Sequence, residues 1–239
     1  MLKYGIYVFM IVGVLGKAMP ELWGGEDNPP YLIHHVAGIA ARTQNLLKYE
    51  EYIKTLPFDG ISVNIPISWY GMDPSYAYTY DDVYNHWLAP LKNRFPNLRH
   101  NFLLMKIRNP PDLFGDGWDQ VLANWKVAAE AARDAGFEGI MFDNEEDTEE
   151  DRLWLYPDSV DFPEKSFAEY QAKALERGSQ LMNAILSVFP EARVIVFHGP
   201  YVSCERTPAW MTRDQARRSD YDLRGAFFTG MLAVAPPQQ

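Results

Sequence analysis

Two carboxylates stand two residues apart where an apolar segment of the chain ends. Asp143 and Glu145 follow the segment from Gly139 to Phe142, with Asn144 between them. Because side chains of an extended segment alternate between its two faces, these carboxylates lie on one side. Burial and mutual repulsion raise the pKa of at least one member of such a pair. A carboxyl group that keeps its proton can act as the general acid that breaks a glycosidic bond, while its neighbour stabilises the developing positive charge.

A structural role for the same pair stays open. Strand-end carboxylates can cap the next helix or pair with Lys106 or Arg108. The stretch from Asp143 to Asp151 holds seven acidic residues among nine. Such a run is typical of a solvated loop, and it can also indicate a Ca²⁺ site. Its spacing is not that of an EF-hand loop, so we predict no metal, and the proposed chemistry requires no cofactor.

Polar and aromatic residues follow the other apolar segments in the same way. In parallel α/β folds, ligands bind where the strands end. The residues expected to line a sugar-binding site there are His35, Asn64, Trp69, Tyr70, Lys106, His198 and Tyr201. Trp154, Tyr156 and Trp210 belong to loops predicted on the same side, where aromatic rings either stack on sugars or cover the core. Trp87 and Trp125 fall within predicted helices and are expected in the core.

Short apolar segments alternate with longer amphipathic ones along the chain. The predicted strands are Tyr31–Val36, Gly60–Ile65, Asn101–Ile107, Gly139–Phe142 and Arg193–Phe197. The predicted helices are Gln44–Leu56, Tyr80–Phe95, Trp118–Ala135 and one that begins with a capping box at Ser166 and Glu169. Thr43, Thr79 and Asp116 are the expected caps of the first three helices, and Gly136 is expected to end the third.

This alternation predicts an α/β fold with parallel strands and helices packed outside them. A (β/α) barrel of TIM type needs eight units and about 250 residues. Five clear units are present, followed by a weaker region from Pro208 to Ala235. The expected fold is therefore a TIM-type barrel that is incomplete at its C-terminus. An open doubly wound sheet is the alternative, although Ala37 to Ala41 is a weak substitute for its glycine-rich phosphate loop.

The segment from Glu138 to Glu145 resembles the fourth-strand signature of chitinase-like glycoside hydrolases. Gly139, Asp143 and Glu145 match that signature, while Glu138 replaces its first aspartate and Met141 replaces an acid. The pair Asn144-Glu145 is similar to the pair that ends the fourth strand in the large clan of retaining glycosidases. More broadly, four segments resemble bacterial TIM-barrel proteins assigned as glycoside hydrolases: 32–35, 57–61, 139–145 and 166–188.

These resemblances imply roles for the two carboxylates. In the retaining clan the matching glutamate is the acid/base, and a second glutamate comes from the seventh strand, for which we find no counterpart here. In a substrate-assisted enzyme, the acetamido group of the sugar attacks instead. Such an enzyme requires only an acid, here Glu145, and a supporting aspartate, here Asp143.

Composition narrows the class of partner. The chain has 239 residues, is 47% hydrophobic and carries a formal net charge of −10. This acidity argues against a nucleic-acid binder and against a polybasic membrane-surface protein. The single cysteine, Cys204, cannot form an internal disulfide. The expected partner is a carbohydrate.

The N-terminus has the pattern of a secretory signal peptide. Lys3 precedes an apolar run from Tyr4 to Leu15, and small residues follow, with cleavage expected after Ala18. The predicted organisation is a signal peptide over residues 1–18 and one barrel-type domain over 19–239, in a secreted or periplasmic protein without a membrane span after processing. Alternatively, Tyr4–Val14 is a buried strand.

Two other functions stay open beside the glycoside hydrolase. The first is a barrel that binds glycans without cleaving them. The second is a metal-dependent hydrolase or lyase that uses the acidic loop together with His35 or His198.

Overall fold

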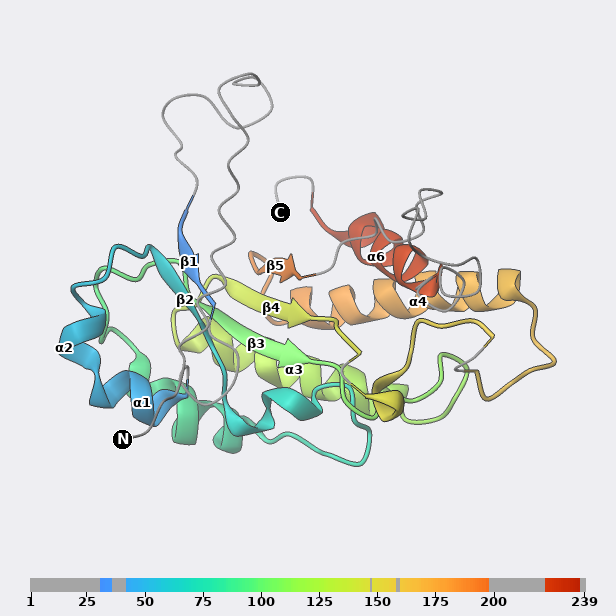
Figure 1. Ribbon diagram of the computed structural model, residues 1–239, viewed down its shortest axis with the longest axis horizontal. Helices are drawn as coiled ribbons and strands as arrows, with labels where there is room; N and C mark the ends of the chain where they lie inside the picture. The colour runs from blue at the N-terminus through green and yellow to red at the C-terminus, as the bar shows by residue number, and fades with distance from the viewer. Residues whose placement is uncertain (1–30, 36–41, 147, 158–159, 198–221, 237–239) are drawn as a thin grey trace, which may run out of the picture.

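Five short strands form one sheet in which every neighbouring pair is parallel. The computed structural model describes residues 31–35, 42–146, 148–157, 160–197 and 222–236. The strands are β1 (Ile33–His34), β2 (Gly60–Val63), β3 (Phe102–Lys106), β4 (Gly139–Asp143) and β5 (Arg193–Val196) (Figure 1). The structure confirms all five predicted strands. Most are shorter than predicted, and β4 extends one residue further, to Asp143.

The strands cross the sheet in the order in which they occur in the chain, β1-β2-β3-β4-β5. A doubly wound sheet reverses its strand order at a switch point. The five described strands show no reversal, so the doubly wound alternative is wrong for this part of the chain. The architecture is α/β, with a curled, all-parallel sheet that has the form of a half-barrel.

The curl of the sheet brings its two outermost strands together. In a flat sheet β1 and β5 would be about 19 Å apart, because neighbouring strands are about 4.8 Å apart. The rings of His35 and Phe197, the residues directly after these strands, instead meet edge to face with centroids 4.4 Å apart. The inside of the curl is filled by an apolar cluster of Ile33, Phe102, Leu104, Met141, Ile195 and Phe197. The polar side chains therefore lie beyond this packed interior, where the strands end.

Helices cover the opposite face of the sheet. Leu103, Ile140 and Phe142 alternate with the inward residues and pack in the larger core with α3 (Trp118–Asp134) and α4 (Phe167–Leu186) (Figure 1). The remaining helical segments are α1 (Thr43–Lys48), α2 (Glu50–Ile53), η2 (Pro66–Tyr70), the π-helix η3 (Asp81–Leu88), η4 (Ala89–Leu91), η5 (Glu149–Asp151) and α6 (Asp222–Val234). Within the described residues, no helix has both the length and the apolar character needed to cross a bilayer.

Three predicted capping features are confirmed. The backbone N–H of Glu169 donates to Ser166 Oγ at 3.3 Å, and that of Ser166 donates to Glu169 Oε2 at 2.9 Å, which forms the capping box of α4. Gly136, with a φ of 78°, follows the end of α3 as predicted. Thr79 Oγ1 accepts the backbone N–H of Asp82 at 3.1 Å at the start of η3.

Two predicted caps are wrong. The hydroxyl of Thr43 donates to the carbonyl oxygen of Trp87 at 2.8 Å, so it links α1 to η3 and caps neither helix. The residue before α3 is Gly117, whose φ of 101° glycine adopts readily, and Asp116 makes no cap. The first predicted helix is divided into α1 and α2 at Tyr49, and the second ends in the 3₁₀ segment η4, which contains Pro90.

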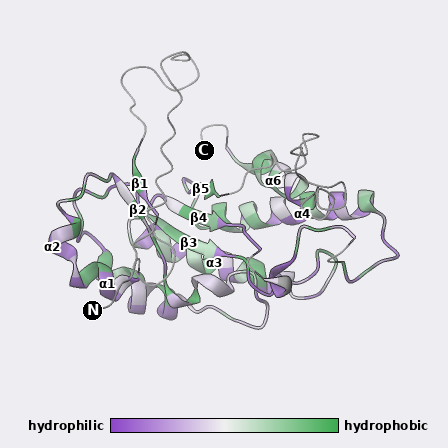
Figure 2. Cartoon of the chain, viewed as in Figure 1, coloured by the Kyte–Doolittle hydropathy of each residue, from purple (hydrophilic) through white to green (hydrophobic). Residues whose placement is uncertain are grey.

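The helix α6 is absent from the prediction, although its sequence contains a signal for it. Leu223, Phe227, Phe228 and Met231 are buried and recur at helical spacing. Most of α6 is apolar (Figure 2), which hides this periodicity. Gly178 of α4 and Gly230 of α6 let the two helices touch, since an added Cβ at either would lie 1.9 Å from a backbone oxygen of the other helix.

This close approach predicts that Gly178→Ala destabilises the protein. In an exposed helix the exchange would stabilise by about 0.5–1 kcal/mol. Here we expect a loss of about 1–3 kcal/mol, because the new methyl group meets the carbonyl oxygen of Phe227. Urea unfolding measures the change. The reverse exchange at an exposed α4 position, Ala172→Gly, is the matched control, and a stabilising Gly178→Ala would contradict the predicted contact.

Candidate functional site

A buried ion pair lies at the carboxyl ends of β3 and β4. Lys106 and Asp143 are register partners in the parallel ladder, and each points to the inner face two residues beyond an apolar core residue. Lys106 Nζ lies 2.9 Å from Asp143 Oδ2, with side chains only 7% and 4% exposed. Burial raises the pKa of Asp143, the charge and hydrogen bond of Lys106 oppose the rise, and Glu145 adds to it. The predicted rise in the pKa of one carboxyl group is thus confirmed at Asp143.

Glu145 lies just beyond this pair and is exposed. Its backbone N–H faces Asp143 Oδ1 at 3.4 Å. Between them, Asn144 is fully buried, and its carbonyl oxygen accepts the indole N–H of Trp154 at 3.3 Å. The chain therefore places one carboxylate inside the protein and the next at the surface.

Trp69 covers the ammonium group of Lys106. Its ring centroid is 4.0 Å from Lys106 Nζ, at a distance typical of a cation–π contact. Trp69 comes from η2, the turn after β2, whose start is held by the backbone N–H of Ile65 donating to Ser68 Oγ at 3.1 Å. The predicted residues Lys106, Asp143 and Trp69 are thus brought together.

His35 joins this group from β1. Its Nδ1 lies 2.7 Å from Ser62 Oγ, and its ring contacts Phe197. Burial lowers the pKa of His35 to about 4, assisted by the charges of Lys106 and His34 and opposed by Glu145. His35 is therefore neutral at neutral pH, within electrostatic reach of Lys106 and Glu145.

This lowered pKa predicts how stability depends on pH. Between about 6.5 and 4 the unfolded state binds a proton on His35 that the folded state does not, so stability is full above this range and is lost as the pH falls through it. Because the ring is partly exposed, we expect a contribution of about 1–2 kcal/mol. Urea unfolding at pH 7 and pH 4 should show that much less acid sensitivity in His35→Gln. Equal sensitivity in the two proteins would contradict the assignment.

The other predicted binding residues do not all lie beside this group. Asn64 is buried directly after β2, 1% exposed. Tyr70 packs against the helix-side core and stacks on Tyr76 with centroids 4.5 Å apart. His198 and Tyr201 lie outside the described residues, as does Trp210.

For Trp154 the sequence left two roles open, stacking on a sugar or packing in the core, and the structure places it in the core. This side chain is fully buried in the helix-side core, where it packs against Phe227. Tyr156 packs against Phe167 and Tyr170. Trp125 is buried as predicted, and Trp87 is partly buried against the same core.

The acidic stretch after β4 is more structured than a solvated loop. Glu146 Oε1 accepts the backbone N–H groups of Leu153 and Trp154, at 2.5 and 2.8 Å. Asp151 is buried and accepts the Thr148 hydroxyl at 2.9 Å and the Asn109 backbone N–H at 3.3 Å. These carboxylates fold the loop and tie it to the segment after β3. Within the described residues, no group of three or more His, Cys, Asp or Glu side chains is placed to hold a metal ion.

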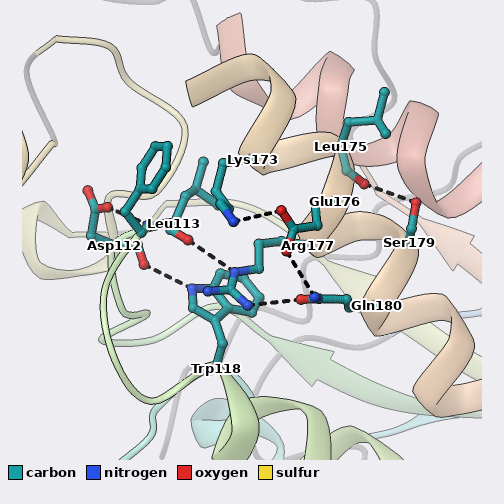
Figure 3. A network of polar contacts seen from close by, with 10 residues as sticks. Asp112, Leu113, Trp118, Lys173, Leu175, Glu176, Arg177, Ser179 and Gln180 are labelled. Carbon is teal, nitrogen blue, oxygen red and sulfur yellow. Dashed lines mark hydrogen bonds and ion pairs between the residues drawn. The ribbon is translucent and has the colours of Figure 1, made fainter. Parts of the chain in front are cut away.

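The loop after β3 is anchored by residues that the sequence analysis did not single out. Asp112 accepts the hydroxyl of Tyr170 at 2.8 Å and the backbone N–H of Phe114 at 2.7 Å. In Figure 3 the Asp112 carbonyl accepts the indole N–H of Trp118 at 2.9 Å, and Arg177 of α4 donates to Leu113 at 3.0 Å. The loop is therefore fixed to α3 and α4. The run Pro110-Pro111-Asp112 is a turn signal that could have indicated it.

No family model, curated protein or solved structure matches the chain by sequence or by fold. Its function is therefore inferred from the side chains gathered where β1 to β4 end.

Proposed function

We propose that this chain is a glycoside hydrolase in which Glu145 is the general acid and Asp143 its electrostatic partner. The proposal is based on two carboxylates at the carboxyl end of β4, of which Asp143 is buried and Glu145 is exposed. Both lie beside Lys106 and His35. Ligand sites of parallel α/β folds lie at this end of the strands. We further propose that the curled sheet is the wall of a TIM-type barrel, which its sequential parallel order supports.

The two carboxylates are suited to different tasks. A general acid must reach the bond that it protonates, and Glu145 is exposed. Asp143 is buried and held at 2.9 Å by Lys106, so it contributes a fixed charge below the site. That charge stabilises positive charge developing on the sugar ring.

The reaction is a hydrolysis. The carboxyl group of Glu145 gives its proton to the glycosidic oxygen as the bond from that oxygen to the anomeric carbon breaks. Water supplies the hydroxyl group that the anomeric carbon gains, and its remaining proton restores the acid form of Glu145. In this proposal Trp69, whose ring lies against Lys106, contacts the sugar by its ring. His35, which is hydrogen-bonded to Ser62, contacts it by a hydrogen bond.

Product release from a panel of polysaccharides and aryl glycosides tests the proposal. We expect reducing sugar or aryl alcohol to be released from at least one class of substrate. Absence of release from every substrate, by protein shown to be folded, would overturn the proposal.

A second candidate is a barrel that binds glycans without cleaving them. It is favoured by the ion pair, because Lys106 weakens the electrostatic effect that Asp143 can have on a sugar above it. Calorimetric binding of an oligosaccharide without turnover would identify this function.

A further inference from the structure

Ser62 forms a buried hydrogen bond with the ring of His35. Ser62 is fully buried in β2, where it pairs with Phe102 of β3, and its Oγ lies 2.7 Å from His35 Nδ1. Ser62 is not among the predicted site residues, since an isolated serine within an apolar strand belongs to no motif. Through His35, this contact connects the end of the edge strand β1 with β2, beside the polar residues Lys106 and Asp143.

The chemistry of the two groups decides which of them donates. Within the described residues, the Ser62 hydroxyl has one hydrogen-bond partner, His35 Nδ1. If Nδ1 carried the hydrogen, the buried hydroxyl proton of Ser62 would have no acceptor, which is unfavourable. Ser62 therefore donates, Nδ1 accepts, and the hydrogen of the neutral imidazole is on Nε2.

The charges around His35 favour the neutral ring. Lys106 and His34 oppose its protonation and Glu145 favours it, while Phe197 contributes an apolar contact from the opposite edge of the sheet. Burial is the largest effect. One of the two ring nitrogens, Nδ1, is hydrogen-bonded to Ser62, and the ring is partly exposed.

We propose that Ser62 is a positioning residue that fixes His35 as a neutral imidazole with its hydrogen on Nε2, so that His35 donates a hydrogen bond to an uncharged oxygen of a neutral sugar. The assignment of a sugar ligand rests on the proposed function. The assignment of the tautomer does not depend on that function, because it rests on the hydrogen bond between Ser62 and His35.

The charge of the site favours a neutral sugar over an acidic one. The ammonium group of Lys106 is already paired with Asp143 at 2.9 Å. A uronate carboxylate would therefore find the ammonium group of Lys106 already compensated, and it would meet in His35 a neutral donor. A sugar hydroxyl needs only that donor.

Long-range proton–nitrogen NMR spectra of the full chain test the tautomer. The chain has 5 histidines, and His35→Gln identifies the signal of His35. At neutral pH we expect Nδ1 of His35 to be unprotonated and Nε2 protonated. Ser62→Ala should give a mixture of tautomers, and Ser62→Thr, which keeps the hydroxyl, should restore the wild-type signal. A protonated Nδ1 in the wild type, or the same spectrum in Ser62→Ala, would overturn the proposal.

A second measurement tests the ligand. Cello-, xylo-, manno- and chitohexaose and an oligogalacturonate of equal length are added separately, with the His35 Nε2 signal as the readout. We expect one neutral oligosaccharide to shift it, and Ser62→Ala to weaken that binding by about tenfold, the loss of one hydrogen bond. A shift caused only by oligogalacturonate, or by none of the five, would overturn the ligand assignment. Product release is measured independently, so failure of the hydrolase proposal leaves the tautomer result distinct.

Discussion

Glu145→Gln is expected to reduce hydrolysis by about 10²–10⁴-fold, the contribution of a well-placed general acid. The amide keeps the size and the hydrogen-bonding capacity of the carboxyl group but cannot deliver a proton. Because Glu145 is exposed, the exchange should leave the stability of the fold nearly unchanged. The measurement is kcat/KM on the most active substrate, with urea unfolding in parallel.

The matched control is Glu150→Gln, which removes an exposed acid from the same loop. It makes the net charge of the chain less negative by one unit, as Glu145→Gln does, and should keep full activity. A second test of the acid role compares two substrates that differ in their leaving group. An aryl glycoside with an acidic phenol needs little protonation of the departing oxygen, so Glu145→Gln should lose less activity on it than on a natural glycan. Equal loss on both substrates, or substantial activity on the glycan, would contradict the acid role of Glu145.

The strands were predictable because each is a short apolar segment followed by polar residues. β3 and β4 illustrate this, since their five residues each are buried on both faces and the chain turns polar at Lys106 and Asp143. Burial on both faces is what a parallel sheet between a packed interior and a layer of helices requires. The same pattern predicted polar side chains at the strand ends, and Lys106 and Asp143 lie at the ends of β3 and β4.

Pairing of a strand-end carboxylate with Lys106 or Arg108 was one open alternative, but the sequence could not decide which of these residues meet. Lys106 and Asp143 meet because β3 and β4 align in one register, and the sequence contains no local signal of that register. The contact between His35 and Phe197 depends on the curl of the whole sheet. Such long-range contacts decide which charges are neutralised and which stay exposed.

The environment of single residues was also unpredictable where tertiary packing overrides a local preference. Trp154 follows an acidic stretch and reads as a loop residue, yet Glu146 turns the chain back by accepting its backbone N–H, and the indole enters the core. Asp151 is buried for a related reason, since Thr148 and Asn109 supply its hydrogen bonds. A count of charges cannot distinguish carboxylates that fold a loop from those that face water.

The ion pair gives the largest expected change in stability. Lys106→Met leaves the carboxylate of Asp143 buried without its partner, and breaking a buried pair in this way costs about 3–5 kcal/mol. Methionine keeps most of the length of the lysine side chain, so the loss of packing against Trp69 is small. Urea unfolding at neutral pH measures the loss. It should diminish at acidic pH, because Asp143 can then take up a proton and become neutral.

The double variant Lys106→Met/Asp143→Leu separates the effect of the pair from the effect of its parts. With both charges removed, no buried charge is left without a partner, and stability should return to within about 1–2 kcal/mol of the wild type or exceed it. Hydrolysis should not return, because the fixed charge below Glu145 is then missing. A double variant as unstable as Lys106→Met would show that packing of the lysine, and not its charge, holds the ends of β3 and β4 together. Restored stability without activity would instead assign the pair to the site: a charge kept at a strand end for chemistry, where an apolar pair would serve the fold equally well.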